Sequence, residues 1–186
     1  MKNVVFVFSV FLLSSLAFAQ DGLDDDHQIA FALPATSVLD IEGPGGDKHL
    51  TFTTQAVVEA GSANDYDLVD ETLWLNYTNV KPGSGSTRKI VVQMNGDLPD
   101  GMTLTVAANG YAGNGEGEVG TPHPSAIVLD GSIASIVTNI GSVYTGNGIS
   151  NGHNLIYALT FDEDQIEYLS ANLNTSVIIT YTIEDE

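Results

Sequence analysis

The sequence contains no cysteine, and only five lysine and arginine residues stand against 24 aspartate and glutamate residues. Without cysteine the chain has no disulfide, no catalytic thiol and no lipid-modified N-terminal cysteine, so its stability has to come from packing. The formal net charge of −19 describes an acidic surface that repels phosphate backbones and anionic lipid headgroups. This charge argues against nucleic acids and against electrostatic membrane docking as partners.

Long hydrophobic runs are also missing, apart from one at the N-terminus. Residues 4–17 are apolar except for three serines, follow Lys2, and end at the small-x-small sequence Ala17-Phe18-Ala19. The run is too short to span a bilayer comfortably, because a membrane helix needs about 20 apolar residues. We therefore predict a signal peptide over residues 1–19, with an uncleaved anchor as the alternative, and an exported protein outside the cell, at its surface or in the periplasm.

The rest of the chain has the length and composition of one domain. Residues 20–27 are acidic without an apolar period and are predicted to form a flexible tail. From residue 28 to residue 186 the chain is predicted to form a single domain, because 43% of the whole sequence is hydrophobic and all-β domains often reach this length.

Most of this domain alternates apolar and polar residues, which is the period of β-strands. Clusters of glycine, proline, asparagine and aspartate separate the alternating runs. Strands are predicted at residues 29–33, 38–41, 50–53, 73–78, 90–94, 102–106, 127–129, 136–137, 155–159 and 177–183. The last run is apolar enough to predict a central position in its sheet.

One segment follows a helical period instead. Asp162 and Gln165 resemble a capping box, and apolar residues at helical spacing continue to Leu173. The prediction is an antiparallel β-sandwich with one short crossover helix. A closed barrel is the alternative, because periodicity does not decide how strands close.

Acidic residues before the strand at 73–78 form a candidate calcium site. Calcium prefers several carboxylate and carbonyl oxygens on a flexible loop. A hydrated surface loop is the alternative interpretation, since runs of charge are usually solvated. The candidate ligands are Asp65, Asp67, Asp70 and Glu71. No other cofactor is predicted.

Two loops rich in glycine and asparagine, residues 110–118 and 141–152, are candidates for ligand recognition. Loops of a sandwich gather at its ends and often carry binding residues. Tyr111, Tyr144 and His153 are the predicted contact residues, with plain loop solubility as the alternative. The first loop is not a phosphate-binding loop, because no helix or lysine follows it.

No catalytic constellation is visible in the sequence. The four histidines lack the spacing of metal ligands, and no serine lies in a Gly-x-Ser-x-Gly elbow. A carboxylate pair for glycoside hydrolysis stays open, because it requires only two acids at a set distance in space. We predict a protein that is not an enzyme.

Four segments resemble secreted immunoglobulin-like β-sandwich proteins of marine and gut Bacteroidota: residues 73–78 (LWLNYT), 88–93 (RKIVVQ), 98–104 (LPDGMTL) and 179–183 (ITYTI). They are more distantly similar to pilin and spore-coat-type subunits, which polymerise by donating a strand to a neighbour. The resemblance implies an immunoglobulin-like fold and assigns no functional residue.

Residues 28–41 are the candidate donor strand. Ile29, Phe31 and Leu33 alternate with alanines, and Leu39 and Ile41 continue the pattern after Pro34. Such a segment is able to insert into the next subunit through main-chain hydrogen bonds and apolar side chains. The first hypothesis is therefore a self-associating structural or adhesive subunit, such as a fimbrial subunit. Alternatively, the segment is the first strand of its own sandwich and the protein is a monomeric module that binds a glycan or small ligand.

Overall fold

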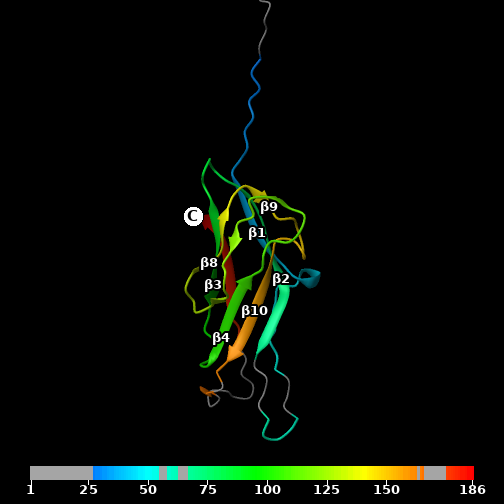
Figure 1. Ribbon diagram of the computed structural model, residues 1–186, viewed down its shortest axis with the longest axis vertical. Helices are drawn as coiled ribbons and strands as arrows, with labels where there is room; N and C mark the ends of the chain where they lie inside the picture. Colours follow the sequence, from blue (N-terminus) through cyan, green and yellow to red (C-terminus); the bar gives the residue numbers. More distant parts are fainter. Residues whose placement is uncertain (1–26, 55–57, 63–66, 163, 166–174) are drawn as a thin grey trace, which may run out of the picture. The chain divides into compact units, whose positions relative to one another are not determined.

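The computed structural model describes residues 27–54, 58–62, 67–162, 164–165 and 175–186. The chain divides into two units, residues 1–33 and 34–186. In the first unit, residues 27–33 are described and carry no helix or strand (Figure 1). The predicted signal peptide, and the predicted tail up to residue 26, lie outside the described residues.

Residues 34–186 form two antiparallel β-sheets packed face to face, which is an all-β sandwich as predicted. Figure 1 shows β4, β10 and β2 side by side, with β3 and β8 in the other layer. The first sheet contains β1 (Thr36–Glu42), β2 (Leu68–Val80), β4 (Met102–Ala108), β5 (Glu116–Gly117), β7 (Ile127–Val128), β9 (Val143–Tyr144) and β10 (His153–Phe161). The second contains β3 (Arg88–Asn95), β6 (Thr121–Pro122), β8 (Ala134–Ile140) and β11 (Ile178–Asp185), and a short 3-10 turn η1 (Pro44–Gly46) follows β1.

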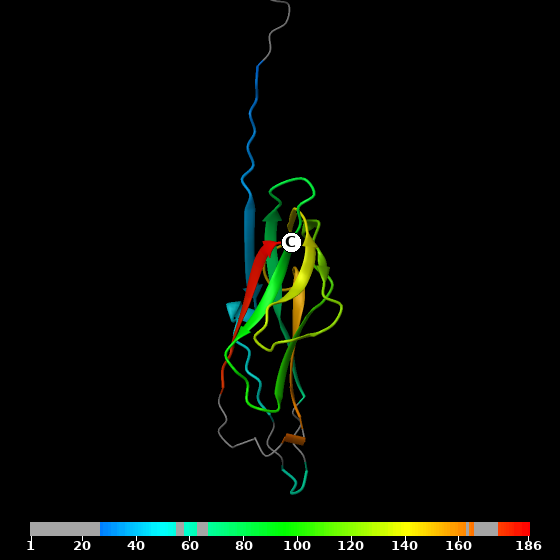
Figure 2. The ribbon, with the colours of Figure 1, turned by 90° about the vertical axis from the view of Figure 1, so that its left-hand side faces the viewer.

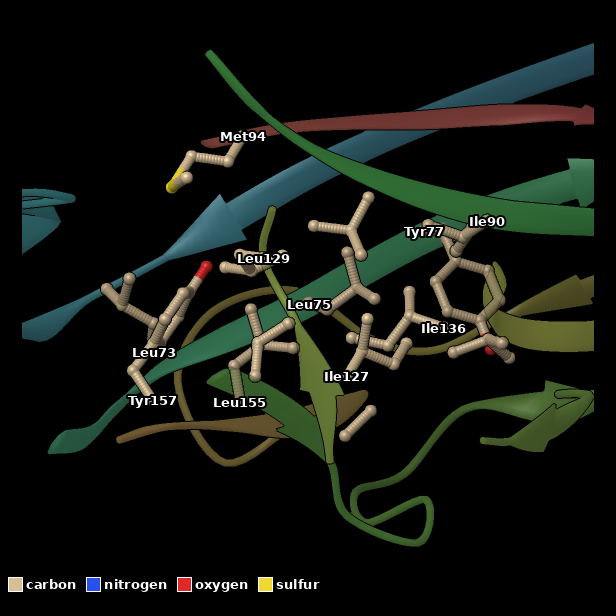
Figure 3. Close-up of a cluster of buried hydrophobic side chains, with 14 of the residues drawn as sticks. Leu73, Leu75, Tyr77, Ile90, Met94, Ile127, Leu129, Ile136, Leu155 and Tyr157 are labelled. Atoms are coloured by element: carbon tan, nitrogen blue, oxygen red, sulfur yellow. The ribbon is translucent and has the colours of Figure 1, made fainter. Parts of the chain in front are cut away.

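The core lies between the two sheets, because alternate residues of each strand point inward. Leu75 of β2, Leu155 of β10 and Ile136 of β8 are completely buried and pack in one cluster (Figure 3). The strand predictions for 73–78, 90–94, 102–106 and 155–159 are confirmed, and each strand extends beyond the predicted run.

Two predicted strands are absent from the sheets. Residues 29–33 and 50–53 are described but pair with no strand. Pro34 interrupts the first run before the ladder of β1 begins, since proline has no amide hydrogen to donate. Leu50 and Phe52 nevertheless pack against the core as half-buried side chains, so their alternation reflects burial without pairing.

The position predicted for residues 177–183 is wrong. β11 pairs with β3 alone among the described strands and forms an edge of the second sheet. Its side chains alternate between half-buried Ile179, Tyr181 and Ile183 and the exposed outer row, in which Ile178 is 70% exposed. A strand with the composition of a central strand therefore lies at an edge, where hydrophobic strands are usually avoided.

A tyrosine pair joins the two sheets. The hydroxyl oxygens of Tyr157 on β10 and Tyr181 on β11 lie 2.5 Å apart. Burial raises the pKa of Tyr157 to about 12 and raises the pKa of Tyr181 well above its ordinary value. Both tyrosines are therefore harder to ionise in the folded chain than in the unfolded chain.

We predict alkaline destabilisation from this pair. A raised folded-state pKa gives stability that is complete below pH 10, the ordinary tyrosine value, and is lost as the pH rises through 12. The free energy of unfolding, measured by urea titration at pH 9 and pH 11.5, should fall less in Tyr157→Phe than in the native chain. The half-exposed Tyr144, changed to Phe, is the control; equal pH dependence in all three chains would contradict the prediction.

The predicted crossover helix lies mostly outside the described residues. At its start, Asp164 N donates to Asp162 Oδ1 at 3.1 Å and Gln165 Nε2 donates to Asp162 Oδ2 at 3.0 Å. The amide of Asp162 donates to Gly101 O at 2.8 Å and not to Gln165, so the two residues interact without the reciprocal backbone bonds of a capping box. Among the described residues, no helix has the length and apolar character needed to cross a membrane.

Candidate functional site

Of the candidate calcium ligands, Asp67 lies just before β2, and Asp70 and Glu71 lie near the start of that strand. Among the described residues, no group of three or more acidic, histidine or cysteine side chains is placed to hold a metal ion. Asp65, the fourth candidate ligand, lies outside the described residues. Asp70 accepts hydrogen bonds from the amide and hydroxyl of Thr72 at 2.8 and 2.7 Å, a local turn at the start of the strand. The calcium prediction for these four acids stays untested.

The two glycine-rich loops meet, as the sequence led us to expect. Ala112 and Gly152 exchange both backbone hydrogen bonds, at 2.9 and 2.8 Å. Gly115 N donates to the hydroxyl of Tyr111 at 2.5 Å, and that hydroxyl donates to Thr145 O at 3.2 Å. Tyr111 therefore ties one loop to the other.

His153 packs beneath the two glycine-rich loops. Its ring is completely buried, stacks on Tyr77 and lies in a T-shaped arrangement with the ring of Tyr111. Nδ1 donates to Asn109 O at 2.8 Å, because a carbonyl oxygen only accepts. Nε2 lies 2.9 Å from the hydroxyl of Tyr77.

This position corrects one sequence prediction. His153 is not a surface contact residue, because its ring is buried and both its nitrogens have protein partners. Burial also lowers the pKa of His153, although the bond to Asn109 opposes that shift. The sequence carried no signal for this burial, since His153 follows Ser150, Asn151 and Gly152 in what reads as a polar loop.

The buried imidazole predicts a loss of stability in mild acid. Its folded-state pKa is below 6.5, so its stabilising contribution is complete above pH 6.5 and is lost as the pH falls through the folded value. Between pH 7.5 and pH 5, the free energy of unfolding should therefore fall more in the native chain than in His153→Gln. Urea titrations across this range measure the difference; parallel pH profiles would contradict the prediction. His123→Gln, an exposed histidine, should follow the native profile.

Tyr144 lies in a different place, on the outer face of the first sheet. Pairing places Val38 of β1, Thr78 of β2 and Tyr144 of β9 side by side in one row, and Asp40 next to Asn76 in the adjacent row. Together with Asn147 these side chains line a shallow pocket of about 280 Å³, which we call the Tyr144 pocket. Tyr144 is 50% exposed there.

Hydrogen bonds hold the walls of the Tyr144 pocket in place. Asn76 is 4% exposed and its Nδ2 donates to Gly148 O at 2.9 Å, which fixes the loop over β2. The hydroxyl of Thr145 accepts from Tyr77 N at 2.9 Å. Asp40 accepts from Lys48 Nζ at 2.5 Å and from Ile41 N at 2.9 Å, and its hydrogen bond with Lys48 lowers the pKa of the carboxyl.

The structure divides the candidate donor segment. Leu39 and Ile41 belong to β1, which pairs with β2 of its own chain along its full length. Ser37 Oγ donates to Asn79 Oδ1 at 2.6 Å and accepts from Arg88, so β1 is also tied to the second sheet. Ile29, Phe31 and Leu33 are 81%, 86% and 66% exposed.

Comparison with protein families, curated proteins and solved structures finds no match to this chain. The functional interpretation therefore depends on the residues themselves.

Proposed function

We propose that this protein is an exported, non-enzymatic structural or adhesive subunit that assembles with copies of itself at the cell surface. Each chain donates residues 28–33 as a β-strand to the β11 edge of the next chain. Repeated head-to-tail contacts of this kind do not close, so they build a filament.

The exposure of Ile29, Phe31 and Leu33 carries this proposal. Three large apolar side chains in strand alternation are 66–86% exposed in the isolated chain. Burial of each such side chain stabilises a protein by about 1.5–3 kcal/mol. A partner surface that covers the three side chains therefore gains a substantial part of the free energy of association.

The edge at β11 has the chemistry to receive this segment. Its half-buried Ile179, Tyr181 and Ile183 repeat every second residue, as do the three apolar residues of the donor. The edges of β1 and β11 lie next to each other (Figure 2), and no ladder between them is found among the described residues. No described strand pairs with this edge of β11, so an added strand would bond to its backbone groups and cover its half-buried inward side chains.

Charge supports the same pairing. The chain carries 24 acidic residues, yet residues 28–39 contain no charged side chain, and neither do residues 175–183. Two acidic surfaces repel each other, so an assembly contact is favoured where both partners are neutral. Lysine or aspartate on an edge strand usually prevents such pairing, and the donor segment has neither.

Light scattering and negative-stain microscopy of residues 20–186 test this function. The native chain should form oligomers or fibres, and Phe31→Asp should stay a folded monomer, because a charge replaces the central apolar side chain. Ile133→Asp is the matched control, since Ile133 is 64% exposed elsewhere and its change should leave assembly intact. Monomers in all three chains, or assembly in all three, would overturn the proposal.

A further inference from the structure

The Tyr144 pocket has features that assembly does not explain. It lies on the outer face of the first sheet. There the strand register places the polar residues Asp40, Asn76 and Thr78 around the ring of Tyr144. None of its lining residues belongs to the donor segment 28–33 or to β11.

We infer that the Tyr144 pocket binds a neutral carbohydrate. A sugar ring presents a flat apolar face of C–H groups together with hydroxyl groups around its edge. The half-exposed ring of Tyr144 and the 58% exposed Val38 offer an apolar surface to the C–H face of the sugar. The carboxylate of Asp40, the amide of Asn147 and the hydroxyl of Thr78 offer hydrogen bonds to the sugar hydroxyl groups.

The size of the pocket fits one such ring. Its volume of about 280 Å³ is just below the range for drug-sized ligands, roughly 300–1,000 Å³, as expected for a ligand of one sugar ring. The three strands of the row span about 10 Å, at about 4.8 Å between neighbours. A longer sugar chain would therefore place one ring in the pocket and its neighbouring rings outside.

The charges select a neutral sugar. Asp40 is the carboxylate of the pocket, and its hydrogen bond with Lys48 favours the ionised form and lowers its pKa. Lys48 is already engaged by that carboxylate at 2.5 Å. A uronic acid or sulfated sugar would be repelled by this carboxylate and by a chain of net charge −19. The pocket lining contains no lysine or arginine to offset that repulsion.

The rigidity of the site supports the inference. The bonds of Asn76 to Gly148 and of Thr145 to Tyr77 hold the pocket before a ligand arrives, which reduces the entropy lost on binding.

Isothermal titration calorimetry of residues 20–186 with oligosaccharides tests this site. The probes are the hexasaccharides of glucose (α-1,4, β-1,4 and β-1,3), xylose, mannose and N-acetylglucosamine, with oligogalacturonate as the charged comparison. We expect at least one neutral probe to bind and oligogalacturonate to bind more weakly. Tyr144→Leu should weaken binding about tenfold, and Tyr144→Phe, which keeps the ring, should bind like the native chain.

Ile133→Leu, at an exposed site outside the pocket, is the control and should leave the dissociation constant unchanged. Absence of binding by all six neutral probes, stronger binding of oligogalacturonate, or unchanged affinity in Tyr144→Leu would overturn the inference. The assembly state of each variant is measured alongside. Failure of sugar binding in a chain that still forms fibres separates this inference from the proposed function.

Discussion

Leu155→Ala is expected to destabilise the sandwich by about 2–5 kcal/mol. Leu155 is completely buried on β10, between β2 and β4, and packs in the core cluster. Truncation removes apolar contacts and leaves a cavity that the flanking strands fill only in part. Because a domain of this kind is stable by about 5–15 kcal/mol, the loss is a large fraction of the total.

Urea denaturation followed by the fluorescence of Trp74, the single tryptophan, measures this effect. Ile178→Ala is the matched control, because Ile178 is 70% exposed and its truncation should change the free energy of unfolding by less than about 0.5 kcal/mol. A loss below about 1 kcal/mol in Leu155→Ala would mean that β10 does not lie at the centre of the core.

Gly152→Ala is the second change with a large expected effect. Gly152 has a φ of 81°, and a Cβ atom there would lie 2.1 Å from Leu75 O and 2.8 Å from Asn76 Oδ1. The backbone must therefore move at the point where the two glycine-rich loops join β2. We expect a loss of at least about 3 kcal/mol in the free energy of unfolding.

Gly85→Ala separates the two causes of that loss. Gly85 has a similar φ of 82°, but a Cβ atom there would meet nothing within 4 Å. Its change should cost about 1–2 kcal/mol, the penalty for a side chain in the left-handed region. Equal losses in Gly85→Ala and Gly152→Ala would contradict the close approach between Gly152 and β2.

The sequence was sufficient to predict the strands in which the apolar residues form one buried face and the polar residues form the exposed face. In β4, Leu104 and Val106 are buried and Thr103 is exposed, so a period of two is directly visible in the sequence. The run at 29–33 has the same period without a partner strand. Alternation reports that a strand has two different faces, but it does not report what covers them.

The candidate site was harder to predict. Val38, Thr78 and Tyr144 become neighbours only through the register of three strands, and Asp40 and Asn76 meet through the same register. Of these residues the sequence indicated Tyr144, because it lies in a glycine-rich loop. The edge position of β11 was hidden by its apolar composition, which is also the composition expected of a strand that receives a partner.

Disulfide trapping between chains tests strand donation most directly, since the chain has no cysteine of its own. The donor chain carries Ala30→Cys or Ala32→Cys, and a tagged acceptor chain carries Thr180→Cys or Thr182→Cys on the outer row of β11. Side chains that face each other across paired strands come within about 4.5–5.5 Å, close enough for oxidation after small adjustment.

Strand donation predicts covalent donor–acceptor dimers on a non-reducing gel for at least one of these four pairs. Phe31→Asp in the donor chain should abolish them. Thr103→Cys, an exposed threonine on β4, is the control acceptor and should give few dimers. Dimers that are no more abundant with β11 than with β4 would contradict the account.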